Sequence, residues 1–188
     1  QYPKAYEYFE FMDANSQTAR VEDKTSFYRY TRETKLDSYS RPKVFIPMTV
    51  SNVSAIFKDG DWFGDNSNIN TIMDDNDDST YLKALGCIFN SPIFNRFALC
   101  FAGEASGGYH KLNKQFLQNV PVPLLTQDDI EHLSSVFDKI VESKKVLAQA
   151  FGGREEYFKS ELKRSIDEVN QYVTQKYDLT DEEMALIS

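Results

Sequence analysis

The sequence predicts an α+β fold: a small mixed or antiparallel sheet with flanking helices, followed by a C-terminal antiparallel helical hairpin. Short β-branched and aromatic runs, separated by turn residues, occupy the first third of the chain. Two long apolar stripes with helical spacing, separated by Gly152 and Gly153, occupy the last third. We therefore expect an α+β domain over residues 1–126 and a helical hairpin with a tail over residues 127–188.

The first elements are short. Aromatic residues recur at helical spacing over residues 3–12, which predicts a short amphipathic helix. FYRYTR, residues 27–32, alternates in a pattern typical of a strand or extended segment. VFIPMTVS, residues 44–51, is apolar and β-branched, but Pro47 interrupts it and favours an edge or bulged strand.

The next two elements should complete the sheet. An Asp-Gly turn at residues 58–61 separates two apolar pairs, Ile56 with Phe57 and Trp62 with Phe63, which predicts a β-hairpin. INTIM, residues 69–73, predicts one more strand before a polar run.

Two helices should follow. Ser79 precedes an apolar-periodic run as an N-cap would, and Asn90 suits the end of that helix. Ser91 and Pro92 suit the N-cap and first position of a second helix, which Gly103 should end.

The helical hairpin carries clear capping signals. Thr126 and Asp129 have the spacing of a capping box, and so do Thr180 and Glu183 before a last short helix. The first stripe is broken only by Lys144 and contains Ile130, Leu133, Phe137, Ile140, Leu147 and Phe151. The second contains Phe158, Leu162, Ile166, Val169, Val173 and Tyr177.

Composition is that of an ordinary globular protein, with 41% hydrophobic and 27% charged residues. No apolar run approaches the roughly 20 residues of a membrane span, so we expect a cytoplasmic protein without a membrane partner. Cys87 and Cys100 lie in apolar helical patterns and are expected to be buried thiols. Because the chain begins with Gln1, we expect it to be part of a longer protein.

Charge is segregated along the chain, whose formal net charge is −8. Residues 20–45 hold seven bases against four acids, and residues 59–78 hold seven acids and no base. A locally basic surface can bind a polyanion whatever the sign of the total charge.

No catalytic or metal-binding motif is evident, and His110 and His132 lack partners at metal-ligand spacing. We expect this chain to be non-catalytic by itself. DDNDDS, residues 74–79, places oxygen donors at alternate positions but departs from the EF-hand template. A solvated loop between strand and helix is the favoured interpretation there, with a calcium-dependent binding domain as a remote alternative.

GEASGGYHKLNKQFLQNVPVPLL, residues 103–125, is unusually rich in hydrogen-bonding side chains. It is either an ordinary polar surface loop or a recognition element. In the second interpretation the glycines allow close backbone approach, the lysines neutralise phosphates, and the amide, imidazole or phenol groups contact bases. Residue chemistry alone favours the first interpretation.

The same stretch resembles the closing signature of the TaqI-like target-recognition domain of N6-adenine DNA methyltransferases and of fused restriction-methylation enzymes. The likeness rests on Gly107 or Gly108, Tyr109, Lys111, Leu112 and the Pro121-x-Pro123 ending. It continues, in order, in FYRYTR, RPKVFIPMTVS, YLKALGCIFNSPIFNRF and VNQYVTQKYDLTDEEMALI, and so covers nearly the whole chain. Each motif alone is weak, and their succession is moderately specific.

This resemblance implies a domain that recognises double-stranded DNA and positions the target adenine for a catalytic methyltransferase domain of the same parent chain. It implies S-adenosylmethionine in that separate domain and no cofactor in this chain. The nucleic-acid-binding candidates are Arg29, Arg32 and Lys43 for the backbone, and Ser51, Asn52, Ser106, Tyr109, His110, Lys111 and Lys114 near bases or phosphates. Ion pairing with nearby acids is the plain alternative for Arg29 and Arg32. A protein-protein interaction module with an acidic surface is the alternative for the whole chain.

Overall fold

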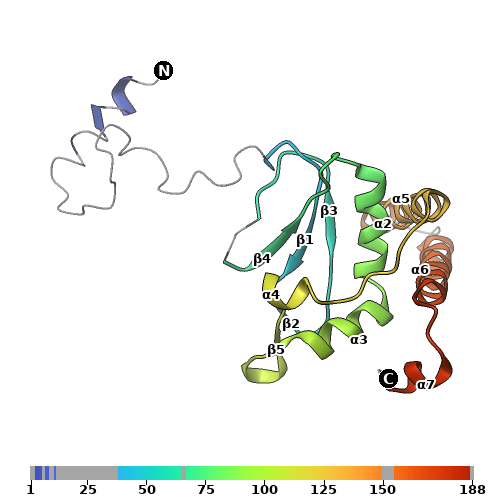
Figure 1. Ribbon diagram of the computed structural model, residues 1–188. Helices are drawn as coiled ribbons and strands as arrows, with labels where there is room; N and C mark the ends of the chain where they lie inside the picture. The colour runs from blue at the N-terminus through green and yellow to red at the C-terminus, as the bar shows by residue number, and fades with distance from the viewer. Residues whose placement is uncertain are drawn as a thin grey trace. The chain divides into compact units, whose positions relative to one another are not determined.

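The computed structural model describes residues 3–5, 7–8, 11, 38–64, 67–149 and 155–186 (Figure 1). The chain divides into two compact units, Gln1–Tyr39 and Ser40–Ser188. In the first unit residues 3–5, 7, 8 and 11 are helical, as predicted for that segment, whereas FYRYTR lies outside the described residues. The rest of this section concerns the second unit, whose combination of small antiparallel sheets and flanking helices confirms the α+β prediction.

The first sheet has three antiparallel strands in the order β3 (Ile56–Lys58), β1 (Lys43–Pro47) and β4 (Ile69–Ile72). Strand β1 pairs with β3 from Lys43↔Lys58 to Phe45↔Ile56, and with β4 from Val44↔Ile72 to Pro47↔Ile69. The expected edge position of this run is therefore wrong, because β1 is the central strand. Pro47 is tolerated there because it lies beyond the last residue that pairs with β3.

The β-hairpin expected at residues 56–63 is also wrong. The turn exists, with positive φ at Gly60 and Asp61, but residues 62–64 form no strand. Instead β3 pairs with β1, and Lys58 places its ammonium 4.1 Å from the centre of the Trp62 ring. The tryptophan thus packs back on β3 by its side chain, without a backbone ladder.

The second sheet has the order β2 (Thr49–Val50), β6 (His110–Lys111) and β5 (Gly103–Glu104), all antiparallel. Strand β2 continues from the end of β1 after a break at Met48, so the predicted strand 44–51 contributes to both sheets. The strands have two residues each, and this sheet is therefore held largely by what surrounds it.

Helices α2 (Ser79–Phe89) and α3 (Pro92–Phe101) follow the first sheet. The N-cap of α2 is Asp78 and not Ser79, because the Asp78 carboxylate accepts hydrogen bonds from the N–H groups of Thr80 and Tyr81. The second start is as predicted, with Ser91 as N-cap and Pro92 at the first position. Helix α3 ends at Phe101, two residues before Gly103.

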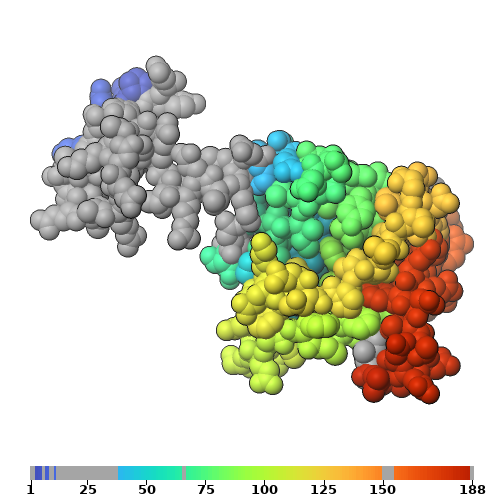
Figure 2. Space-filling model, in the orientation of Figure 1, coloured from blue at the N-terminus to red at the C-terminus, as the bar shows by residue number. Residues whose placement is uncertain are grey.

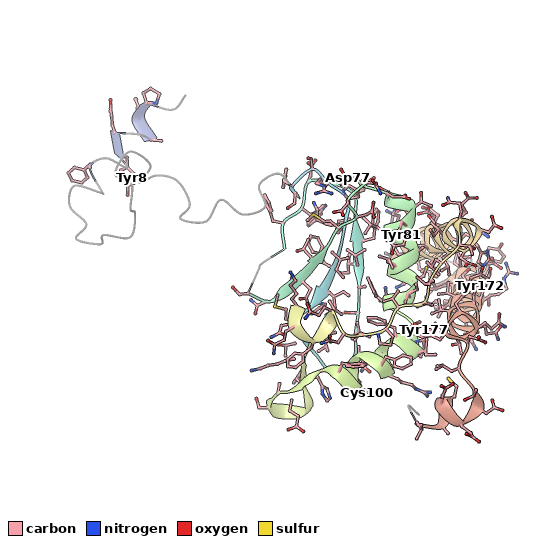
Figure 3. All side chains as sticks on the ribbon, in the orientation of Figure 1. Tyr8, Asp77, Tyr81, Cys100, Tyr172 and Tyr177 are labelled. Atoms are coloured by element: carbon pink, nitrogen blue, oxygen red, sulfur yellow. The ribbon has the colours of Figure 1, made fainter. Side chains whose placement is uncertain are left out.

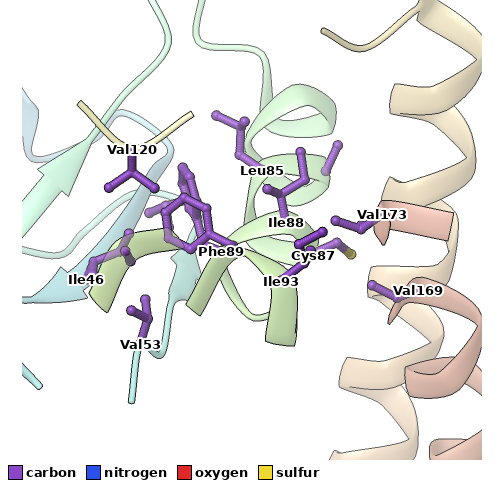
Figure 4. Close-up of a cluster of buried hydrophobic side chains, with 14 of the residues drawn as sticks. Ile46, Val53, Leu85, Cys87, Ile88, Phe89, Ile93, Val120, Val169 and Val173 are labelled. Atoms are coloured by element: carbon purple, nitrogen blue, oxygen red, sulfur yellow. The ribbon is translucent and has the colours of Figure 1, made fainter. Parts of the chain in front are cut away.

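The core lies between β1, α2, α3 and the C-terminal helices. Figure 4 shows Ile46 of β1, Ile88 and Phe89 of α2, and Val169 and Val173 of α6 in one cluster of buried side chains. Cys87 belongs to this core, and its thiol donates to the carbonyl of Leu133 at 3.4 Å. Cys100 is exposed, which corrects the expectation that both thiols are buried.

The C-terminal hairpin is confirmed. Helices α5 (Gln127–Gln149) and α6 (Glu155–Tyr177) pack side by side, and their partners run in opposite directions: Asp129 meets Lys176, and His132 meets Glu168 (Figure 1). Both capping boxes form, since Thr126 and Asp129 exchange backbone-to-side-chain bonds, as do Thr180 and Glu183 before α7 (Asp181–Leu186).

The hairpin packs on the α+β part through α5, which lies against α2. Tyr177 also stacks on Phe97 of α3, with ring centres 5.2 Å apart, and donates its hydroxyl to the carbonyl of Pro121 at 2.9 Å. Burial raises the pKa of this hydroxyl, which therefore stays protonated as a donor. The boundary at residues 126/127 remains a prediction.

Among the described helices, none alone has the length and apolarity needed to cross a membrane; α2 and α3 meet that test only as a pair, bent by 76°.

Candidate nucleic-acid interface

The β5–β6 hairpin forms the centre of the candidate interface. A short 3-10 helix, Ser106–Gly108, connects the strands, with φ of +73° at Gly107 and +76° at Gly108. The N–H of Ala105 donates to the carbonyl of Tyr109 at 3.0 Å and closes the tip. Both positions have a left-handed backbone conformation, in which a residue with a side chain is strained. This explains why two consecutive glycines occur here.

Buried contacts hold this hairpin to the first sheet. Leu112, which follows β6, is fully buried, and its N–H donates to the carbonyl of Met48 at 2.7 Å. Its carbonyl accepts a 2.7 Å bond from the side-chain amide of Asn70, a buried residue of β4. Both polar groups of the Leu112 backbone are thus satisfied inside the protein, and β6 is fixed relative to the first sheet.

The two faces of the small sheet differ. Lys111 lies opposite Thr49 and Gly103, whereas His110 lies opposite Val50 and Glu104, so that the two side chains leave on opposite faces. Val50 is buried and His110 is half-buried, so the His110 face is the inner one. Lys111 is exposed on the outer face.

Gly103 shapes that outer face. A Cβ atom at this position would lie 2.9 Å from the ring of Phe116, which occupies the space above the glycine. Phe116 belongs to α4 (Lys114–Leu117), so this contact brings Lys114 and the polar residues of α4 next to the hairpin. Gly103 therefore serves close packing, and not the helix end that the sequence suggested.

The loop after β2 carries Ser51 and Asn52, both exposed. Two asparagines hold it: Asn95 accepts a hydrogen bond from the N–H of Val53 at 2.7 Å, and the Asn90 side chain bonds both backbone groups of Ala55 at 3.0 Å. Asn52 is in reach of Asn95, at 3.4 Å between side-chain atoms. This loop therefore has a defined position although it lacks regular structure.

The structure thus brings seven of the ten predicted residues to one end of the second unit. They are Ser51, Asn52, Ser106, Tyr109, His110, Lys111 and Lys114. Tyr109 is 50% exposed, and its neighbour Lys111 is also exposed, as a surface contact requires. Figure 2 shows this end as the surface formed by the yellow-green and yellow segments.

Most carboxylates of the acidic run that the structure describes, Asp59, Asp61 and those of residues 74–78, follow the strand ends at the opposite end of β1. The loops after β3 and β4 both start beside Lys43, since Lys43 pairs with Lys58 and Val44 with Ile72. Strand β2 and the hairpin lie beyond Pro47, at the other end. Figure 3 shows the separation, with Asp77 at one end and Cys100 of α3 at the other.

The chain between Ser79 and Thr126 adds to this asymmetry. It contains a single acid, Glu104, and four bases: Lys83, Arg96, Lys111 and Lys114. Arg96 is exposed on α3. Sequence reasoning missed it, although the near absence of acids over this stretch was a readable signal.

Lys43 does not fit a phosphate contact. Only 1% of the residue is exposed, and its ammonium donates to the carbonyl of Trp62 at 3.0 Å. Burial lowers the pKa of this ammonium, against the attraction of Asp61. Lys43 is therefore an internal residue of β1 and is removed from the candidate set. Arg29 and Arg32 lie outside the described residues.

A groove of about 410 Å³ lies beside the hairpin, lined by Met48 and by Asn113, Lys114, Gln115 and Gln118. The side-chain oxygen of Asn113 is buried and has no hydrogen-bond partner among the described residues. An unsatisfied acceptor costs free energy, so this oxygen would gain from a donor brought by a bound molecule. Gln115 was counted from the sequence among the amide groups of the recognition element, but Gln118 was not singled out.

The acidic run 74–78 is a loop between β4 and α2, as the sequence favoured. Its oxygens serve local structure: Asp74 accepts from the N–H groups of Asn76 and Asp78, and Asp77 pairs with Arg41. The Arg41 pKa is raised, chiefly by the hydrogen bond to Asp77. Within the part of the chain that the structure describes, no group of three potential metal ligands occurs.

Comparison with known proteins adds no relative: no family model matches the chain, and no curated protein is similar to it.

Proposed function

We propose that this chain is the DNA sequence-recognition domain of a restriction-modification adenine-N6 methyltransferase. It binds duplex DNA through the hairpin end and positions the target adenine for a separate catalytic domain of the same parent chain, which binds S-adenosylmethionine. The chain itself supplies specificity and not methyl transfer, and the parent acts in the cytoplasm.

The observation that carries this proposal is the convergence of Ser51 and Asn52 with the β5–β6 hairpin. Two short, well-anchored segments carry exposed hydroxyl, amide, phenol and ammonium groups there, and the half-buried imidazole of His110 lies on the inner face between them. Lysines on such a surface position the phosphate backbone, and the polar side chains between them are of the types that contact bases.

The charge distribution supports the same face. A net charge of −8 would repel DNA if the acids were spread evenly. Asp59, Asp61 and the acids of residues 74–78 follow strand ends at the far end of β1, so their repulsion at the hairpin is weakened by distance and salt.

The test is a salt titration of duplex binding by this chain, followed by fluorescence anisotropy with labelled random-sequence DNA. Lys111→Ala and Lys114→Ala should weaken binding of every sequence, and each lost phosphate contact should flatten the slope of log K against log salt by about 0.9. Lys163→Ala is the matched control, since Lys163 is an exposed lysine of α6, far along the chain from the hairpin. If all three variants bind alike, the hairpin is not the DNA face.

A second candidate is a protein-protein interaction module with an acidic surface and no nucleic-acid binding. The exposed side of α6 favours it, because charges of both signs alternate there: Lys159 pairs with Glu155 and Glu156, and Arg164 pairs with Glu161. The same titration separates the two, since this candidate requires no duplex binding even at low salt.

A further inference from the structure

A cavity of about 490 Å³ lies between β3, α2, α5 and α6. Its walls are mainly apolar and include Phe57, Phe137, Ile140 and Val169. Pockets that hold small organic molecules have volumes of about 300–1,000 Å³ and similar walls. The cavity is therefore of the right size and chemistry for a small ligand.

Two lysines line this cavity, Lys58 from the edge strand β3 and Lys144 from α5. Lys144 is the residue that breaks the apolar stripe of α5, so a charged group stands where the helix pattern calls for an apolar one. None of the described lining residues is a carboxylate, although the chain has 29 acids and 21 bases. Within the described ranges Lys144 forms no ion pair, and an anion would give it one.

Two other polar side chains of the cavity, those of Asn90 and Cys87, are already engaged. The side chain of Asn90 forms hydrogen bonds with the backbone of Ala55 and Gly86, and the Cys87 thiol donates to the carbonyl of Leu133. Burial raises the pKa of the Cys87 thiol to about 12, so it is neutral and no nucleophile. The charge preference of the cavity is thus set by the two lysines.

We propose that this cavity binds a small amphipathic organic acid, with its apolar body against Phe57, Phe137 and Val169 and its anionic group paired with Lys144 and drawing Lys58 from Trp62 toward the cavity. A purely apolar ligand leaves both ammonium groups without a counter-charge, and an inorganic anion leaves the apolar walls uncovered. This site is independent of the proposed DNA face, because none of its described lining residues belongs to that face.

Trp62 offers a built-in reporter. It is the only tryptophan of the chain, and its ring lies 4.1 Å from the ammonium of Lys58. An anion that draws Lys58 toward the cavity changes this cation–π contact, and so changes the emission of Trp62.

The experiment titrates this chain with decanoate, below its micelle-forming concentration, and follows both Trp62 emission and the thermal midpoint. Decanol is the neutral analogue and acetate is the anion without an apolar body. We expect decanoate to bind and raise the midpoint, decanol to bind about three- to tenfold more weakly, and acetate to have no effect.

Lys144→Met should weaken decanoate binding by about three- to tenfold while leaving decanol binding unchanged. Lys145→Met is the matched control, since Lys145 is the adjacent exposed lysine and does not line the cavity. Val141→Phe should fill the cavity and abolish binding of both amphiphiles, with its own midpoint showing that it is folded. Equal affinities for decanoate and decanol, equal effects of the two lysine variants, or no response to decanoate would each overturn the proposal.

Discussion

The two hairpins of this protein are built in opposite ways. The helical hairpin α5–α6 has 23 residues in each helix, and its two helices pack on each other as well as on α2. The β5–β6 hairpin has two residues in each strand and depends on groups from other parts of the chain. The helical hairpin is a scaffold, whereas the β-hairpin is a surface element that other parts of the fold hold in place.

The polar network at the base of the helical hairpin joins α5 to α6. Asp129 is buried and accepts from the Tyr172 hydroxyl, pairs with Lys176 and completes the capping box with Thr126. All but the cap residue Thr126 belong to α5 or α6. The Asp129 carboxylate is almost completely buried. A buried charge needs several partners, and Lys176, Tyr172 and Thr126 provide them.

The small hairpin shows the reverse dependence. The partners of Leu112 are Met48 and Asn70, more than 40 residues away in sequence. Its tip is open, since a Cβ atom added to Gly108 would have no neighbouring atom within 4 Å. Residues at the tip can therefore vary in chemistry while buried anchors preserve the backbone, a useful property for a recognition element.

The largest expected effect is the loss of the anchor of the β-hairpin. Leu112→Ala removes a fully buried side chain and should lower the free energy of unfolding by about 2–5 kcal/mol. Leu124→Ala is the control, because Leu124 is 96% exposed and its truncation should change stability by less than about 0.5 kcal/mol. Urea unfolding measures both, and equal effects would contradict the role given to Leu112.

The next largest effect concerns the stability of the helical hairpin, which should depend on pH through Asp129. The hydrogen bond from Lys176, followed by that from Tyr172, holds the pKa of Asp129 well below its usual range. Its stabilising contribution is therefore present above the unfolded pKa of about 3.9 and is lost as the pH falls below that value. Asp129→Asn should destabilise the protein at pH 7, and its difference from wild type should shrink below about pH 4.

Asp128→Asn is the control for this prediction, since Asp128 is the exposed neighbour in the same first turn. Thermal midpoints of the three proteins between pH 3 and 7 test it. A difference between Asp129→Asn and wild type that does not change with pH would show that the amide, and not the charge, matters.

The contrast between the hairpins also explains which features the sequence could predict. Capping boxes and apolar stripes are local, so α5, α6 and α7 were predictable from residues within a few turns of one another. The pairing of β3 with β1, instead of with residues 62–63, depends on which distant strand offers the better partner, and no local pattern contains that information.

The candidate site shows the same limit. The hairpin residues lie close together in sequence, so their clustering required little tertiary information. Lys43 and Cys100 were misjudged because burial is set by the register of β1 and by the packing of α3, which a single residue type does not reveal. Asn70 was missed for a similar reason: only the fold places it beside Leu112.

A smaller effect is expected when a hydrogen bond that anchors the β-hairpin is removed and no apolar core side chain is lost. Asn70→Ala leaves the Leu112 carbonyl without its 2.7 Å donor and should cost about 1–3 kcal/mol. Hydrogen exchange of the His110 and Lys111 amides should accelerate, while α5 and α6 keep their protection. Asn119→Ala is the control, because the exposed Asn119 side chain donates to the nearby Gln115 carbonyl at 2.8 Å and makes no long-range bond within the described residues. Equal exchange in the two variants would show that Asn70 does not anchor β6.

The smallest effect concerns the tip alone. At Gly108, φ is +76° and a Cβ atom would meet nothing within 4 Å, so Gly108→Ala tests backbone strain without a clash. The free energy of unfolding should fall by about 1 kcal/mol, measured by urea unfolding. Ala105→Gly, just before the tip in extended backbone, is a control that adds freedom without relieving strain. If Gly108→Ala is neutral, the tip adopts another backbone conformation at no cost, and the β-hairpin is a less rigid surface than its anchors imply.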